Sequence, residues 1–169
     1  MTTRLPDTSL QNNESFERSG RFVGLNQTEC GLHSHRAKIN KKKEKAAAAG
    51  EEWKVPTLPC EKCIDLDIST FEEFVKSGES DLLVEFFSPY CGGCQEFAPT
   101  LARLAEHLEP SMKVARFDIT EHDPPLFGGN KVFEVEATPT LYLVKYSPFR
   151  VELYEGEHEY HPVLKWLGK

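Results

Sequence analysis

Two cysteines, Cys91 and Cys94, stand two residues apart at the point where an apolar run ends and a helix is expected to begin. Cysteines at this spacing can close a small disulfide ring. At a helix N-terminus the free backbone N–H groups and the positive end of the helix dipole stabilise a thiolate relative to the thiol. The spacing and the position of the two residues therefore predict thiol–disulfide redox chemistry.

An acidic residue, Glu85, interrupts the apolar run Leu82–Phe87 that leads to these cysteines. Such a run is typical of a central strand that is covered on both faces. A carboxylate within it either faces solvent at a local irregularity or is buried with a partner and a raised pKa. A buried Glu85 would be placed to exchange protons with the second thiol through water, as a general acid–base group does.

The other three cysteines leave several roles open. Cys60 and Cys63 form a second C-x-x-C, which is compatible with a second redox pair, a zinc half-site or two loop cysteines without chemistry. No matching ligand pair follows downstream, which disfavours zinc. Cys30 lies near His33 and His35, but these three residues also lack a second ligand pair at a defined spacing. Five cysteines are an odd number and too few for a disulfide scaffold.

Charge divides the chain into two parts. Residues 1–50 carry nine Lys/Arg against five Asp/Glu, whereas the remaining 119 residues carry 11 basic and 22 acidic groups. The basic part has few large apolar residues, so we predict a disordered tail over 1–53 with a short helix-prone patch, followed by a folded domain over 54–169. Its lysine run 41–45 is compatible with a nuclear address or an anionic-surface contact, but a solvated charge run is the commoner explanation. The acidic domain disfavours nucleic acid as a partner.

The N-terminal sequence carries no clear targeting signal. Residues 1–20 lack the apolar stretch of about 7 to 15 residues that a secretory signal needs, and no run approaches the roughly 18 apolar residues of a membrane span. Asp7, Glu14 and Glu17 disfavour a mitochondrial presequence. The sequence as given predicts a cytoplasmic protein, and the endoplasmic reticulum becomes the expectation if the N-terminus is incomplete.

Alternating strand and helix patterns extend from residue 64 to the end of the chain. Apolar residues at 97, 101, 104 and 108 form one stripe of a helix over 91–108, in which Pro99 is expected to cause a kink. Prolines and glycines preclude a long helix over 121–130. The other predicted elements are a strand at 64–68, a helix from 69 or 70 to 76, strands at 82–87 and 113–118, a short helix at 131–134, strands at 141–144 and 151–154, and a helix at 162–167.

This order resembles the thioredoxin fold, over about 110 residues from Cys60 to Lys169. Four motifs carry the resemblance, in order V-E-F-F-S-P-Y-C-G-G-C-Q-x-F-A-P, V-A-R-F-D-I-T, A-T-P-T-L-Y-L and Y-E-G. The first of them is more similar to domains of protein disulfide isomerases than to bacterial-type thioredoxins. The resemblance implies an α/β fold with a central mixed sheet of four to five strands flanked by helices.

The resemblance also assigns roles to individual residues. It implies that Cys91 is the nucleophile, Cys94 the resolving thiol, Glu85 a buried proton-transfer acid and Arg116 the basic partner of that acid. In front of the cysteines it implies a cis-proline at Pro139. The residues that it places in the substrate groove are Tyr90, Thr138 and Pro139.

The chain departs from the isomerase pattern at three places. Gly92 and Gly93 replace a glycine and a histidine, and that histidine would stabilise the reduced form. We therefore predict a disulfide that is less oxidising than that of an isomerase. Gln95 stands in place of a lysine, and Glu157 and His158 stand where isomerases carry a mobile arginine, which disfavours isomerisation relative to simple oxidoreduction.

These features predict a thiol–disulfide oxidoreductase that acts on protein disulfides or dithiols and needs no metal or organic cofactor. The expected partners are protein substrates and a reductase or oxidase that recycles the Cys91–Cys94 pair, and we expect a monomer. One alternative is a thioredoxin-fold adaptor or chaperone that binds extended peptides without turnover. A weaker alternative is that the C-x-x-C pairs bind zinc or an iron–sulfur cluster.

Overall fold

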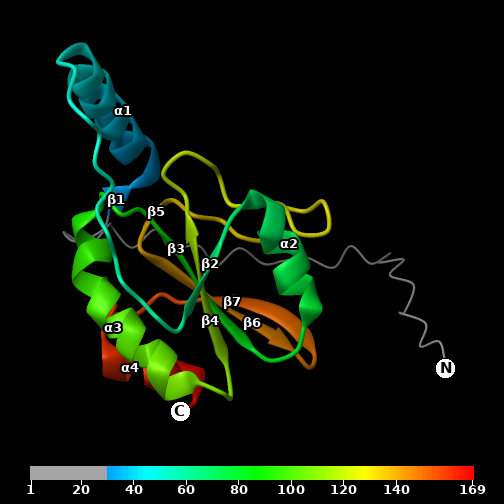
Figure 1. The fold of residues 1–169 in the computed structure, drawn as a ribbon. Helices are drawn as coiled ribbons and strands as arrows, with labels where there is room; N and C mark the ends of the chain where they lie inside the picture. The colour runs from blue at the N-terminus through cyan, green and yellow to red at the C-terminus, as the bar shows by residue number, and fades with distance from the viewer. Residues whose placement is uncertain (1–29) are drawn as a thin grey trace.

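The computed structural model describes residues 30–169, and its centre is a five-stranded sheet in the order β2-β4-β3-β6-β7. β2, β4 and β3 run parallel to one another, whereas β6 and β7 run antiparallel to their neighbours. Helices cover both faces of this sheet (Figure 1), so the predicted mixed sheet is confirmed. The strands are β2 (Cys63–Leu66), β3 (Leu82–Phe87), β4 (Lys113–Asp118), β6 (Thr140–Tyr146) and β7 (Phe149–Leu153).

The central strand β3 sends alternate side chains to opposite faces of the sheet. Leu82, Val84 and Phe86 pack in the core cluster under α2, whereas Leu83 packs in the cluster under α3 and α4. Because side chains alternate along a strand, Glu85 points to the same face as Leu83, toward α3. The helices that pack on this sheet are α2 (Ile68–Ser77), α3 (Gly92–Leu108) and α4 (Tyr160–Leu167).

The helices begin and end close to the predicted positions. α3 buries the predicted stripe Phe97, Leu101, Leu104 and Leu108 against the sheet. The N-cap of α2 is Asp67 rather than Ser69 or Thr70, and its carboxylate accepts the backbone N–H groups of those two residues at 2.8 and 2.9 Å. No helix among residues 30–169 is long and apolar enough to cross a membrane.

The segment between β4 and β6 differs from the prediction. The short helix predicted at 131–134 is absent, because this stretch is held by side chains of the core. Phe133 is buried and packs edge-on against Phe71 and Tyr142. The hydroxyl of Tyr142 donates to the carbonyl of Glu134 at 2.7 Å and accepts its N–H at 3.0 Å, so this backbone is satisfied without a helix.

The predicted disorder of residues 1–53 is wrong for residues 30–48. There the chain forms β1 (Cys30–Gly31) and α1 (Leu32–Ala48), and β1 pairs antiparallel with β5 (Ala137–Thr138). α1 lies beside the N-terminal end of α3 and projects from the domain (Figure 1). Composition missed this helix because only Leu32 and Ile39 are buried within it, so its position depends on contacts with distant parts of the chain. The part of the prediction that concerns residues 1–29 lies outside the described residues.

Candidate active site

The two cysteines lie where β3 ends and α3 begins. Cys91 is the N-cap residue of α3, and its backbone N–H donates to the carbonyl of Ser88 at 3.0 Å. The loop between β5 and β6 faces it, with a cis peptide bond between Thr138 and Pro139. The Sγ atom of Cys91 lies 3.4 Å from the carbonyl oxygen of Thr138. The fold thus brings the predicted redox residues and the predicted substrate-binding loop into contact.

Cys91 is bonded to Cys30 rather than to Cys94. The Cα atoms of Cys30 and Cys91 are 5.9 Å apart, within the range of ordinary disulfides, although 61 residues separate them in sequence. Cys94 is a buried free thiol, and it packs in one cluster with Cys91 and Phe87. The site therefore contains three cysteines, of which the sequence analysis had assigned two.

Burial governs the chemistry of Cys94. Burial, together with the nearby Glu85 carboxylate, raises the pKa of this thiol to about 12. The backbone N–H of Ser88 donates to the sulfur at 3.5 Å and partly opposes these effects. At neutral pH Cys94 is consequently protonated, and it needs a base before it can attack a disulfide.

Glu85 has the properties required of such a base. Only 2% of its surface is exposed, and burial raises its pKa to about 8. The guanidinium of Arg116 opposes this increase, whereas the Asp65 carboxylate adds to it. A carboxyl group with this pKa can gain and lose a proton near neutrality, which is what a general acid–base catalyst requires. Its burial agrees with the second of the two alternatives that the sequence left open.

Arg116 stands beside Glu85 in the register of β3 and β4, but it forms its ion pair with another residue. Its guanidinium binds both carboxylate oxygens of Asp65, at 2.8 and 2.9 Å, and donates to the carbonyl of Leu58 at 2.6 Å. The structure therefore corrects the expected pairing of Arg116 with Glu85. The effect of Arg116 on Glu85 is a through-space charge effect that lowers the pKa of the acid.

The predicted substrate groove holds a segment of the same chain. In the β1–β5 pair Cys30 stands opposite Thr138 and Gly31 opposite Ala137. The N–H of Leu32 extends this pairing by donating to the carbonyl of Glu136 at 2.8 Å. Of the three predicted substrate-binding residues, Thr138 is thus paired with Cys30 of the same chain, and Pro139 follows Thr138 directly.

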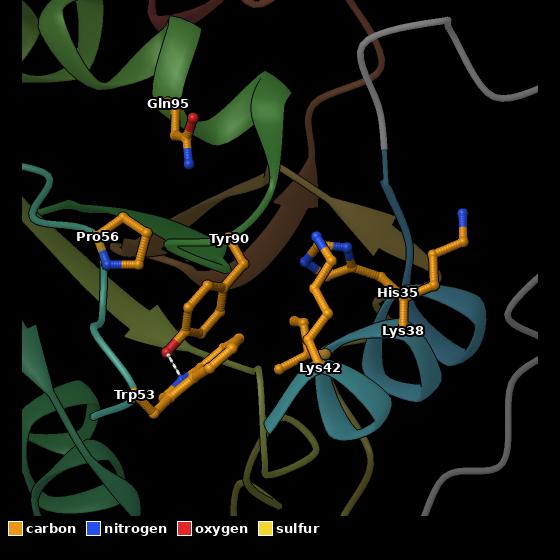
Figure 2. Close-up of a pocket in the computed structure, with 8 residues that line it drawn as sticks. His35, Lys38, Lys42, Trp53, Pro56, Tyr90 and Gln95 are labelled. Atoms are coloured by element: carbon orange, nitrogen blue, oxygen red, sulfur yellow. Dashed lines mark hydrogen bonds between the residues drawn. The ribbon is translucent and has the colours of Figure 1, made fainter. Parts of the chain in front are cut away.

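Tyr90, the third of these residues, lines a pocket of about 320 Å³ beside the cysteines. Figure 2 shows its ring facing Trp53, whose indole N–H donates to the Tyr90 hydroxyl at 2.6 Å. Pro56 and Gln95 lie on one side of the pocket, and residues of α1 form the other side, including His35. α1 therefore forms one wall of the pocket that Tyr90 lines.

Two side chains of α1, His35 and Arg36, contact the loops around the cysteines, and neither contact was predicted from the sequence. His35 Nε2 lies 3.1 Å from the Ser88 hydroxyl, and burial together with nearby lysines lowers the pKa of this histidine. Arg36 donates through Nε to the carbonyl of Ile119 at 2.9 Å. The odd number of cysteines was the one sequence signal for the Cys30–Cys91 bond, because two C-x-x-C pairs leave Cys30 unassigned.

The second C-x-x-C lies at the opposite end of the parallel strands. Cys60 and Cys63 form a disulfide, with Cα atoms 5.3 Å apart. Cys63 begins β2, whereas Cys91 follows the end of the parallel strand β3. The two cysteine pairs are therefore separated along the direction of the strands. Cys60 and Cys63 are therefore not part of this site.

The remaining predicted residues, Gly92 and Gly93, lie between the two cysteines, and Gln95 follows Cys94. Gly92 is exposed with open space around its Cα, and Gly93 is buried in the first turn of α3. Gln95 donates to the carbonyl of Pro89 at 2.9 Å. Within the part of the chain that the structure describes, no three side chains of His, Cys, Asp or Glu converge on a metal site.

Comparison with known proteins agrees with this geometry. The family model described as Thioredoxin matches residues 62–169, and the chain therefore belongs to the thioredoxin family. Protein disulfide-isomerase A3 of Gallus gallus is 33% identical over 105 residues, which are 59% of this chain and 19% of the relative. Protein disulfide-isomerase of Hordeum vulgare is 36% identical over 96 residues, 56% of this chain and 17% of the relative. The chain thus matches about a fifth of the length of these curated relatives.

Two solved structures illustrate the likeness of the fold. The first thioredoxin domain of mouse protein disulfide-isomerase A4 superposes with a TM-score of 0.52 at 25% identity, covering 65% of this chain and 76% of that one. ERdj5 in crystal form I superposes with a TM-score of 0.55 at 23% identity, covering 66% of this chain and 15% of that one. The thioredoxin fold expected from the sequence is thereby confirmed.

Proposed function

We propose that this protein is a thiol–disulfide oxidoreductase that acts on protein disulfides or dithiols through Cys91 and Cys94. The observation that carries this proposal is the bond from Cys91 to a cysteine in the groove beside Thr138. A substrate cysteine in a mixed disulfide with the enzyme needs the same arrangement. The relatives named protein disulfide-isomerase support the same reaction class.

The reaction proceeds in two exchange steps. The Cys91 thiolate attacks one sulfur of a substrate disulfide, and the other substrate sulfur leaves as a thiolate and takes up a proton. Cys94 then gives its proton to the Glu85 carboxylate and attacks the Cys91 sulfur. A Cys91–Cys94 disulfide forms, the bond from Cys91 to the substrate breaks, and the second substrate sulfur leaves as a thiolate and takes up a proton. The substrate has gained two electrons, and the cysteine pair has lost them.

The same residues can run the reaction in reverse and install a disulfide. We propose that a partner reductase or oxidase recycles the pair and that the protein acts as a monomer. Because Gly92 and Gly93 provide no side chain that stabilises the Cys91 thiolate, we expect a less oxidising disulfide than in isomerases.

Insulin reduction by dithiothreitol tests this function. The full-length chain should accelerate the precipitation of reduced insulin several-fold over dithiothreitol alone. A Cys60→Ser/Cys63→Ser double variant serves as the control and should match the wild type, because that disulfide lies at the other end of the parallel strands. A peptide-binding adaptor would bind the insulin chains without accelerating their release, and that result would reject the enzymatic function.

A further inference from the structure

Residues 30–32 occupy the groove in the manner of a bound peptide. They add an antiparallel strand to β5, with Cys30 opposite Thr138 and the N–H of Leu32 donating to Glu136. Addition of a strand to an exposed edge is a common mode of peptide recognition, in which backbone hydrogen bonds provide affinity. In addition, Cys30 bonds covalently to Cys91, the cysteine that the proposed reaction uses as its nucleophile.

The helix that follows carries charges opposite to those of the surface it covers. Arg36 forms an ion pair with Asp123 at 2.7 Å, and Lys43 forms one with Glu121. Both acids belong to the segment after β4. The basic part of the chain thus meets the acidic domain, and this charge complementarity is compatible with a lysine-rich helix at this place.

Apart from the disulfide, the attachment of α1 is weak. Of its 17 residues only Leu32 and Ile39 are buried. The acids in its two ion pairs are 77% and 60% exposed, and ion pairs in such positions contribute little to stability. The Cys30–Cys91 bond is therefore the main link, and the segment can leave the groove once that bond is broken.

We propose that Cys30 is a third redox-active cysteine of this site, whose disulfide with Cys91 closes the substrate groove with the chain's own residues 30–32. The proposal rests on the oxidoreductase function given above, and it adds an internal competitor for the same nucleophile. Protein substrates enter only when Cys91 is released from Cys30.

The release step is a balanced exchange that needs no external oxidant. Cys94 gives its proton to Glu85 and attacks the Cys91 sulfur, so that a Cys91–Cys94 bond forms and the Cys30–Cys91 bond breaks. The Cys30 thiolate leaves and takes a proton from solvent. Both states contain one disulfide, so the ratio of closed to open oxidised protein is set by the chain itself. A dithiol that reduces either disulfide also opens the groove.

The internal segment competes strongly with dilute substrates. A group on the same chain as its reaction partner has an effective concentration of about millimolar. Substrate disulfides at about a tenth of that concentration therefore react roughly tenfold more slowly while Cys30 is present, as long as reductant is scarce.

Peptide mapping of the full-length Cys94→Ser protein tests the bond. Trypsin places Cys30 in the peptide 22–36 and both Cys91 and Cys94 in the peptide 77–103. After oxidation with glutathione disulfide and quenching with acid, we expect the two peptides to be linked in most molecules. If Cys91 is instead found linked to glutathione and the Cys30 peptide is not linked to the Cys91 peptide, the proposal is wrong.

Activity measurements test whether this bond closes the groove. With limiting glutathione as reductant and about 0.1 mM insulin, the Cys30→Ser protein should reduce insulin roughly tenfold faster than the wild type. The Cys60→Ser/Cys63→Ser protein, which lacks the other disulfide, should keep the wild-type rate. The Cys30→Ser/Cys94→Ser protein should accumulate an insulin adduct on Cys91, whereas Cys94→Ser should not, because Cys30 displaces the insulin.

The outcomes separate the two proposals. Equal rates for Cys30→Ser and wild type, with both above background, would reject the closure by Cys30 and keep the oxidoreductase function. Linked peptides in Cys94→Ser, together with no insulin reduction by any variant, would reject the function and support the pairing of Cys30 with Cys91.

Discussion

The Cys91→Ser protein should reduce insulin no faster than dithiothreitol alone. Cys91 supplies the only proposed nucleophile, and its serine hydroxyl cannot form the mixed disulfide on which both exchange steps depend. Loss of a covalent nucleophile lowers turnover by several orders of magnitude, so we expect the whole several-fold acceleration over dithiothreitol to disappear. Insulin precipitation at a fixed dithiothreitol concentration measures it.

Two controls accompany this variant. Circular dichroism should show an intact domain, because the core clusters under α2 and under α3 do not depend on the Cys91 sulfur. The Cys60→Ser/Cys63→Ser protein should remain active. If Cys91→Ser retained activity and the Cys60→Ser/Cys63→Ser protein lost it, the second disulfide would be the redox centre and our assignment would be wrong.

The Glu85→Gln protein should be more stable than the wild type at alkaline pH and equally stable at acidic pH. Burial raises the pKa of Glu85 from 4.5 to about 8 in the folded protein. Between these values Glu85 binds more protons in the folded state than in the unfolded state. Its contribution to the unfolding free energy of the wild type therefore falls as the pH rises from 4.5 to 8. Glutamine has nearly the same shape as glutamate and no charge. The Glu85→Gln protein therefore does not lose this unfolding free energy as the pH rises.

The size of the effect follows from the pKa difference. At 1.36 kcal/mol for each pKa unit, the wild type loses about 4 kcal/mol of unfolding free energy by pH 8, and about 2 kcal/mol by pH 6. Urea unfolding of both proteins at pH 4.5, 6 and 8 measures this difference. The Glu73→Gln protein serves as the control, because Glu73 is exposed on α2. A constant difference between Glu85→Gln and wild type across this range would show that Glu85 is not a buried acid with a raised pKa.

The same substitution should slow the chemistry. Without the Glu85 carboxylate, Cys94 loses the base that we propose for its proton, and burial still keeps the pKa of this thiol above its ordinary value. General-base contributions are about a hundredfold or more, so Glu85→Gln should release substrate from Cys91 about a hundredfold more slowly. A gain in stability together with a loss of activity is the signature of a functional buried charge.

Most of the domain was predictable because its signals are local. The apolar run of β3, the helical stripe of α3 and the proline of the β5–β6 loop each lie within a few residues of chain. Glu85 was recognisable because a charge inside such a run is costly and needs a reason. These local patterns were sufficient to predict a redox pair at Cys91 and Cys94 and a buried acid at Glu85.

The N-terminal segment was not predictable in the same way. Residues 30–48 contain too few apolar side chains to indicate a packed helix, and their contacts join positions that are tens of residues apart. The ion pair between Arg116 and Asp65 was missed for a related reason. It depends on β2 pairing with β4, where register places these residues side by side. Sequence patterns report local preference, whereas register and long-range pairing emerge from the whole fold.

The most direct test of the account is a redox titration of the Cys91–Cys94 pair in the Cys30→Ser protein, which leaves Cys91 free to bond with Cys94. Samples equilibrated in glutathione buffers are quenched with acid, alkylated and mapped. We expect the peptide 77–103 to lose two hydrogens in one two-electron transition, at a potential more negative than the roughly −180 mV of protein disulfide isomerase. If Cys94 remains open to alkylation at every potential, then Cys94 does not resolve Cys91 and the proposed mechanism is wrong.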